Sequence, residues 1–204
     1  MFDQIRFDER GLVACVTQDY DSGEVLTLAY MNEEALRRTL ESGEVHFFSR
    51  SREKIWHKGE TSGNVQRLRQ LRYDCDGDAL LALVEPAGPA CHTGERSCFF
   101  RELPGGGRPG PATHEALAVL DRTLDDRARE RPEGSYTVEL LDDPARIGAK
   151  MAEEADEVAR AARGESPERV AAEAADVLYH LSVLLRSRGV SASAALEVLN
   201  GRRR

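Results

Sequence analysis

The sequence predicts a protein of two domains, in which a β-rich α+β domain precedes an all-α helical bundle. Three observations favour this division. Short β-type runs separated by turns fill the first hundred residues, a Pro/Gly-rich segment follows at 104–111, and apolar residues then recur at helical spacing. With 204 residues in all, we expect a first domain over 1–104, a linker over 105–112 and a second domain over 113–204.

In the first domain, β-strands are predicted where apolar and β-branched residues lie between turn signals. Residues 12–16 and 25–30 flank Asp21-Ser-Gly23 and predict a β-hairpin. Asn32 is suited to cap a short helix that ends at Gly43. Further strands are expected at 45–48, 55–56, 65–73, 79–84 and 97–101.

In the second domain, four helices are predicted from the apolar period. They cover 113–131, about 144–163, 167–188 and 191–200. Ser166 as N-cap and Pro167 at the first helical position mark the start of the third helix, and Gly189 ends it. No repeat links the two halves.

Composition excludes several classes of protein. The formal net charge is −8, and residues 1–108 and 109–204 each carry 18 acids against 14 Lys and Arg, so neither half favours nucleic-acid binding. The longest apolar run, 79–84, is far shorter than the ~20 residues of a membrane span. The N-terminus lacks a basic segment followed by an apolar one. We expect a soluble, cytoplasmic protein.

All four cysteines lie in the first half. Thiols stay reduced in the cytoplasm, so clustered cysteines there suggest a metal site before a disulfide. Cys15 lies inside an apolar strand and is expected in the core. Cys75, Cys91 and Cys98 form no Cys-x-x-Cys pair, and three thiolates would leave a zinc position open to water, as in catalytic sites. His92 could then be a fourth ligand, a proton-transfer group or a structural histidine.

Carboxylates gather in both halves. Asp74, Asp76 and Asp78 lie within five residues, which favours a divalent cation such as Mg²⁺, with a polar turn as the alternative. Five more acids have i,i+3 or i,i+4 spacing on two predicted helices and could hold cations between them. Solvated helix faces are the alternative for this set, which comprises Glu153, Glu154, Glu157, Glu173 and Asp176.

Four segments of the first half resemble, in order, the signature segments of phosphoribosyl-AMP cyclohydrolase of histidine biosynthesis. They are Ser49–Arg52, Trp56–Asn64, Asp74–Leu80 and Cys91–Phe99. The resemblance implies zinc, about one per chain, held by Cys75, Cys91 and Cys98 from two chains of a homodimer. It also implies Mg²⁺ at Asp74, Asp76 and Asp78.

The implied chemistry suits these residues. Zinc lowers the pKa of water, and the resulting hydroxide would attack C6 of the phosphoribosylated adenine ring and open the N1–C6 bond. His92 is our candidate for moving the proton. Arg50, Arg52, Lys58 and the amides around 59–63 would hold phosphate groups, unless they form only a solvated loop.

The second half resembles the all-α nucleoside-triphosphate pyrophosphohydrolases. Its Glu-Glu-x-x-Glu and Glu-x-x-Asp patterns match their metal motif, although Ala152 stands where that family often has Gly. Ser135–Leu141 and Ala175–His180 narrow the resemblance to phosphoribosyl-ATP pyrophosphohydrolase. This implies Mg²⁺ between the triphosphate and the carboxylates, a water activated by Glu154 or Glu157, and phosphate contacts from Arg146 and Lys150.

The two resemblances predict consecutive reactions on small nucleotide substrates. The second domain would release pyrophosphate from phosphoribosyl-ATP, and the first would open the ring of the phosphoribosyl-AMP produced. Two alternatives stay open on sequence grounds. One is a house-cleaning nucleotide pyrophosphatase with a zinc-stabilised, non-catalytic first domain, and the other is a zinc-dependent interaction protein with an acidic helical tail.

Overall fold

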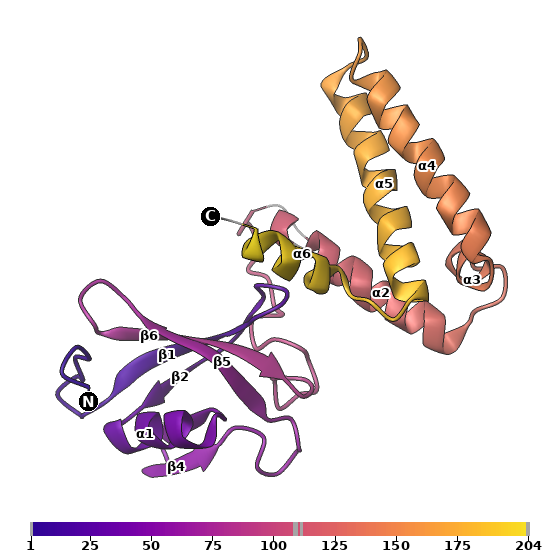
Figure 1. Ribbon diagram of the computed structural model, residues 1–204. Helices are drawn as coiled ribbons and strands as arrows, with labels where there is room; N and C mark the ends of the chain where they lie inside the picture. Colours follow the sequence, from indigo (N-terminus) through magenta and orange to yellow (C-terminus); the bar gives the residue numbers. More distant parts are fainter. Residues whose placement is uncertain (1, 108–109, 111, 203–204) are drawn as a thin grey trace. The chain divides into compact units, whose positions relative to one another are not determined.

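The computed structural model describes residues 2–107, 110 and 112–202, and it divides into two compact units, Met1–Pro111 and Ala112–Arg204. Strands fill the first unit and helices the second (Figure 1), so the predicted two-domain layout is confirmed. Within the expected linker at 105–112, residues 108, 109 and 111 lie outside the described residues.

A four-stranded sheet forms the first unit, in the order β2-β1-β6-β5. β1 (Val13–Asp19) and β2 (Val25–Met31) pair antiparallel as the predicted hairpin, while β1 and β6 (Ala79–Pro86) run parallel. β5 (Gln66–Tyr73) pairs antiparallel with β6. A separate ribbon joins β3 (His46–Ser49) to β4 (Lys54–His57).

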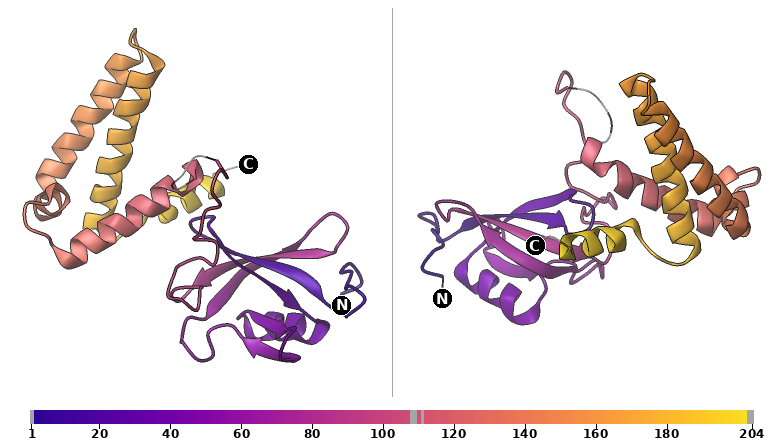
Figure 2. Two further views of the ribbon diagram at one scale, coloured as in Figure 1. Left: turned by 180° about the vertical axis from the view of Figure 1, so that it is seen from behind. Right: turned by 45° about the horizontal axis from the view of Figure 1, so that its top comes forward.

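Helix α1 (Glu33–Ser42) packs on one face of this sheet (Figures 1 and 2). Its cap is as predicted, because the Asn32 side chain accepts from the Ala35 amide and Gly43 follows in the left-handed conformation. Leu26, Leu36 and Phe47 fill the core between the layers. Cys15 is fully buried among them as expected, and burial raises the pKa of its thiol to about 12.

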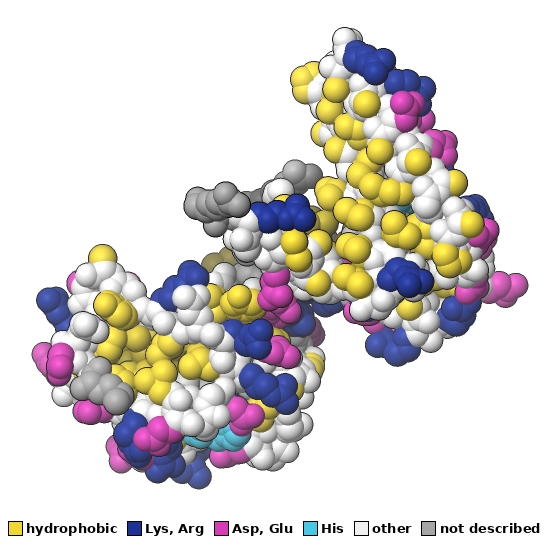
Figure 3. Space-filling view, viewed as in Figure 1, with side chains coloured by type: hydrophobic (Ala, Val, Ile, Leu, Met, Phe, Trp, Pro, Cys, Tyr) yellow, Lys and Arg dark blue, Asp and Glu magenta, His cyan; other side chains and the backbone are white. Residues whose placement is uncertain are grey.

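The opposite face of the sheet has an apolar row that the first unit itself leaves partly uncovered. Val16 lies between Leu28 on β2 and Leu81 on β6 in the strand register, so all three side chains share this face. Leu28 is 49% exposed. Figure 3 shows hydrophobic side chains gathered on the surface of this unit.

One predicted strand is wrong. Residues 97–101 form irregular backbone with a turn at 98–99 rather than a strand. The segment does lie against β2, but it is held there by the Cys98 amide on the Leu26 carbonyl and by the Ser97 hydroxyl on the Val25 carbonyl. The Ser97 hydroxyl therefore makes a hydrogen bond to β2 that a backbone amide would make in a strand.

The second unit is helical, as predicted, with one helix that the sequence analysis missed. A 3₁₀ turn (Thr113–Glu115) leads into α2 (Ala116–Glu130), and the short α3 (Tyr136–Asp142) is the additional helix. The others are α4 (Pro144–Ala161), α5 (Pro167–Ser187) and α6 (Ala192–Gly201). None of the described helices has the length and apolar character that a membrane span requires.

Helices α4 and α5 form a long hairpin of adjacent helices (Figure 1). Ser166 caps α5 by accepting from the Arg169 amide, and Pro167 occupies the first turn, as predicted. Leu124, Leu140, Ile147 and Val183 form the core where α2, α3, α4 and α5 meet. This packing brings the acidic positions of α4 and α5 together.

Candidate active sites

A cleft of about 440 Å³ opens in the first unit. Its walls come from the loop that follows β4 and the loop that follows β6, together with Thr27 of β2 and Arg52. Four predicted site residues besides Arg52 line it, namely Lys58, Cys91, His92 and Cys98. The fold thus joins segments that are far apart in sequence.

Two thiols lie at this cleft, each beside a threonine hydroxyl. The Thr93 hydroxyl donates to Cys91 Sγ at 3.1 Å, and this bond lowers the pKa of Cys91. Thr27 Oγ1 lies 3.0 Å from Cys98 Sγ, although burial raises the pKa of Cys98. Hydroxyl donors beside sulfur stabilise thiolates, the form in which cysteine binds metal.

Lys58 is buried beside these thiols. Burial lowers the pKa of its ammonium, while the nearby Cys98 and Cys91 act in the opposite direction by charge. An ammonium so placed favours negative charge in the cleft. This is the electrostatic setting that both thiolates and phosphate groups require.

The loop after β4 is folded too tightly for a side chain at Gly59. Its φ is +91°, and a Cβ there would lie 2.4 Å from the Asn64 carbonyl carbon. The turn is closed by the Gly63 amide, which donates to the Gly59 carbonyl at 2.8 Å. Residues 59–62 of this loop line the cleft, and the predicted phosphate contacts of their amides stay a prediction.

Arg50 is placed differently from its neighbour Arg52. Its guanidinium stacks on the Tyr30 ring at 4.0 Å, and it is not among the residues that line the cleft. Its predicted phosphate contact therefore stays a prediction.

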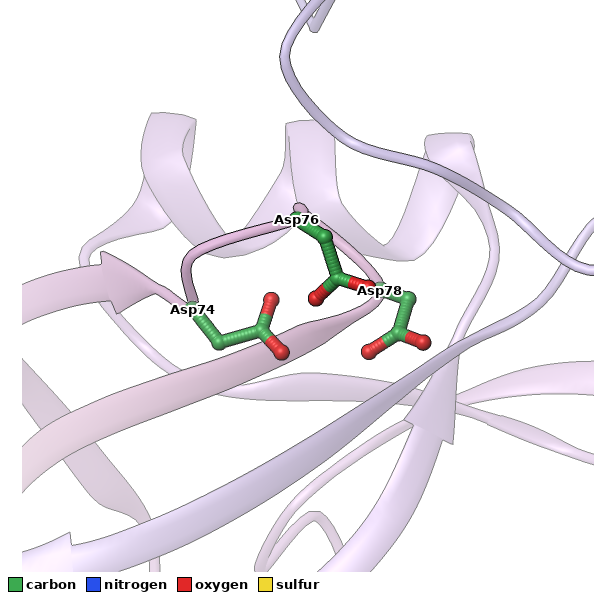
Figure 4. A group of neighbouring side chains, drawn as sticks. All are labelled: Asp74, Asp76 and Asp78. Atoms are coloured by element: carbon green, nitrogen blue, oxygen red, sulfur yellow. The ribbon is translucent and has the colours of Figure 1, made fainter.

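The three aspartates lie on the turn between β5 and β6, with their carboxylates directed toward a common space (Figure 4). Oxygens of Asp74, Asp76 and Asp78 lie within 4.8 Å of one another, and all three residues are exposed. The negative charges of Asp76 and Asp74 raise the pKa of Asp78. A cation would relieve this repulsion.

Gly77 fixes the same turn to the N-terminal segment. Its φ is +79°, its carbonyl accepts from the Arg6 amide at 2.7 Å, and a Cβ would lie 2.1 Å from the Gln4 carbonyl oxygen. Cys75 is exposed on this turn. In the described part of the chain, no group of three close ligand atoms joins Cys75 to Cys91 and Cys98.

The second unit has its own acidic cluster. Glu154 and Glu157 on α4 face Glu173 on α5, and their carboxylate oxygens lie within 4.8 Å of one another. Glu154 and Glu173 are buried, and burial raises the pKa of Glu173. Each carboxylate has a basic neighbour, Lys150 for Glu154, Arg160 for Glu157 and Arg169 for Glu173. Because Glu154 and Glu173 are buried, the solvated-face alternative does not fit these two residues.

The other two predicted carboxylates lie outside this cluster. Glu153 is exposed and pairs with Lys150 Nζ at 2.8 Å, while Lys150 also reaches Glu154 at 3.3 Å. Asp176 is exposed as well. Arg146 lies 3.3 Å from Glu139 and 5.5 Å over the Tyr136 ring.

His180 is a residue to which the sequence analysis gave no role. It is 4% exposed, and its Nδ1 lies 2.9 Å from the Asp176 carbonyl and 3.8 Å from Glu154 Oε1. A carbonyl only accepts, so Nδ1 carries the proton and Nε2 accepts from the Tyr136 hydroxyl at 3.3 Å. Both residues lie in the segments that carried the family resemblance, which was the available signal.

Comparison with known proteins defines a hydrolase with two catalytic domains. The phosphoribosyl-AMP cyclohydrolase model matches residues 27–100, and the phosphoribosyl-ATP pyrophosphohydrolase model matches residues 117–203. The histidine biosynthesis bifunctional protein HisIE of Bacillus subtilis (strain 168) is 49% identical over 208 residues, covering 98% of this chain and 95% of that protein. The HisIE protein of Halalkalibacterium halodurans is 47% identical over 204 residues, covering 99% and 97%.

The chain therefore belongs to the family of bifunctional histidine biosynthesis proteins, with the cyclohydrolase domain before the pyrophosphohydrolase domain. The HisIE protein of Thermus thermophilus is also similar, with 48% identity over 192 residues that cover 92% of this chain and 86% of that protein. Matches to both enzymatic domains argue against the house-cleaning and interaction-protein alternatives.

Proposed function

We propose that the two domains of this bifunctional enzyme use different metal chemistry, zinc with thiolates in the first and Mg²⁺ with carboxylates in the second. The observation that carries the proposal is that each unit holds a ligand set of its own. Two thiols lie at the cleft of the first unit, and three glutamates meet between two helices of the second.

In the first domain, Cys91 and Cys98 would hold zinc at the cleft. Their donor chemistry fits the metal, because a hydroxyl stands within hydrogen-bonding distance of each sulfur and Lys58 lies near both. Bound zinc supplies hydroxide near neutral pH by lowering the pKa of water.

Cleft residues would then serve phosphoribosyl-AMP. His92 is exposed on the cleft wall and would move a proton during opening of the N1–C6 bond. Arg52, Lys58 and the amides of the loop after β4 would hold the phosphate groups, and the exposed aspartates at 74, 76 and 78 would bind Mg²⁺.

The third zinc ligand would be Cys75 of a second copy of the chain. Cys75 is exposed and does not cluster with the other two thiols within one described chain, which supports a site shared across a homodimer. The apolar row of Val16, Leu28 and Leu81 offers a surface that a second copy would cover.

In the second domain, which we assign to the all-α nucleoside-triphosphate pyrophosphohydrolase type, Glu154, Glu157 and Glu173 would hold Mg²⁺. Glu153 and Asp176 would join them only after side-chain movement, because both are exposed outside the cluster. Magnesium would neutralise the triphosphate of phosphoribosyl-ATP. Glu154 or Glu157 would activate the water that cleaves between the α- and β-phosphates, with Arg146 and Lys150 as phosphate contacts. A cytoplasmic location stays a prediction.

Incubation of the purified chain with phosphoribosyl-ATP tests the proposal. We expect pyrophosphate and the ring-opened product in sequence, and metal analysis should find about one zinc per chain. Active, zinc-free protein would contradict the thiolate assignment. Absence of pyrophosphate release with Mg²⁺ present would contradict the assignment of the glutamate cluster.

A further inference from the structure

Arg96 adds two ion pairs to the hydrogen bonds of Ser97 and Cys98 that hold the loop segment from Cys91 to Cys98 against the β1–β2 hairpin. Arg96 Nε bonds to Glu24 at 2.5 Å, and its terminal nitrogen bonds to Asp19. The Asp19 side chain is only 5% exposed and that of Glu24 17%. A carboxylate as buried as Asp19 needs a partner, so this contact is costly to lose.

Asp19 also organises the hairpin turn. Its second oxygen accepts from the Asp21 amide at 2.9 Å and from the Ser22 amide at 3.0 Å. The Asp19 amide in turn donates to the Glu24 carbonyl at 2.8 Å. The turn and Arg96 are therefore joined through one side chain, and neither can shift without moving the other.

On the other side, the Arg96 backbone belongs to the loop that carries both thiols. Its carbonyl accepts from the Ala90 amide at 3.0 Å, one residue before Cys91. Cys98 follows two residues after Arg96, where its amide bonds to Leu26 at 2.8 Å and its sulfur lies 3.0 Å from Thr27 Oγ1. A change at Arg96 should consequently be felt at both sulfurs.

We propose that Arg96 is a positioning residue that fixes the separation of the Cys91 and Cys98 sulfurs by tying their loop to Asp19 and Glu24. The inference rests on the zinc site proposed above. Arg96 touches neither sulfur, so it acts through the backbone of the loop. Residues that support metal ligands in this way typically change metal affinity by about 10–100-fold when replaced.

The test compares Arg96→Gln with Arg96→Lys and Glu24→Gln in the full-length chain. Arg69→Gln is the matched control, because Arg69 is an exposed arginine of the same unit that pairs with Glu85 at 3.8 Å. Affinity for zinc is measured by competition with a chelating dye. Alkylation of Cys91, which is 8% exposed, is followed by mass spectrometry in metal-free protein below its unfolding temperature.

We expect Arg96→Gln to weaken zinc binding about 10–100-fold and to speed alkylation of Cys91, with smaller changes for Arg96→Lys and Glu24→Gln, which each keep one ionic contact. Equal affinity and equal alkylation in Arg96→Gln and Arg69→Gln would overturn the proposal. If Arg96→Gln does not fold, Glu24→Gln decides by the same two measurements. If the unsubstituted chain takes up no zinc, the zinc function fails, and the alkylation rates still decide the role of Arg96.

Discussion

The two candidate active sites differ in how much of their geometry is local. The glutamate cluster comes from two helices, where i,i+3 spacing places Glu154 and Glu157 together and a short connection brings Glu173 opposite them. The cleft of the first unit instead joins Thr27, Lys58 and two cysteines of a later loop. Helical spacing therefore encodes one site directly, whereas the other exists only after the sheet has formed.

Replacement of Cys91 should give the largest separation of the two activities. Cys91→Ser removes a soft thiolate from the proposed zinc site, so ring opening, followed by absorbance of the product, should fall to background. Pyrophosphate release should be unchanged, because it belongs to the other unit. Ring opening that survives in Cys91→Ser would show that the thiol does not serve this reaction.

Replacement of Glu154 should produce the reverse pattern. Glu154→Gln removes a buried carboxylate of the cluster and should slow pyrophosphate release by about 10²–10⁴-fold, with ring opening of supplied phosphoribosyl-AMP unchanged. Asp156→Asn is the matched control, because Asp156 is exposed on the same helix and pairs with Arg160 at 3.0 Å. Similar losses in both variants would mean that acidity of the helix, rather than the cluster, matters.

The buried thiol of Cys15 predicts a pH effect confined to the first unit. Its pKa is about 12 in the folded protein against 9.0 for an ordinary thiol. Between these values the unfolded chain loses the proton first, so stability should fall by about 1.4 kcal/mol per pH unit as pH rises above 9. Below pH 9 both states are protonated and the effect vanishes.

Denaturant unfolding of wild type and Cys15→Ala across this range isolates the contribution of Cys15. The variant is expected to lose less stability than wild type as pH rises, whatever its stability at neutral pH. Parallel pH profiles for the two proteins would contradict the prediction.

The smallest expected effect concerns the hydrogen bond between Tyr136 and His180. Tyr136→Phe leaves Nε2 of a buried histidine without its donor and should lower the stability of the second unit by about 1 kcal/mol. Pyrophosphate release should fall as well, because His180 lies 3.8 Å from Glu154. Tyr179→Phe removes a comparable bond, to Thr137 at 2.8 Å, and keeps the ring that packs edge-on against His180. If it slows the reaction equally, His180 has no special role.

The sequence was sufficient for much of the fold because its local signals agree with the tertiary structure. The hairpin around Asp21–Gly23, the Asn32 and Ser166 caps, and the buried Cys15 all follow from short-range patterns. Residues 97–101 were wrongly predicted as a strand because Phe99 and Phe100 suggested a buried strand, whereas both are exposed and the segment contacts β2 through the Ser97 hydroxyl and the Cys98 amide. The short helix α3 has too few turns to show a helical period.

The residues of the candidate sites could be predicted from the sequence where local spacing reveals them, but their arrangement could not where it depends on tertiary contacts. Spacing identified the carboxylates of α4 and α5, but not that Glu153 and Asp176 lie outside the close cluster, because that depends on how the helices face each other. Thr27 lies outside the segments that carried the family resemblance, whereas Thr93 and Arg96 lie within Cys91–Phe99 but were given no role. Thr27 lies beside Cys98, and Arg96 beside Glu24, only because the fold brings together residues about seventy positions apart in the sequence.

Selective removal of zinc tests the central claim, that one chain holds two independent metal chemistries. The full-length protein is treated with a zinc chelator, supplied with Mg²⁺ and phosphoribosyl-ATP, and analysed for both products. We predict unchanged pyrophosphate release, accumulation of phosphoribosyl-AMP, and recovery of ring opening when zinc is returned. Ring opening that continues in the zinc-free protein, or pyrophosphate release that stops with it, would contradict the account.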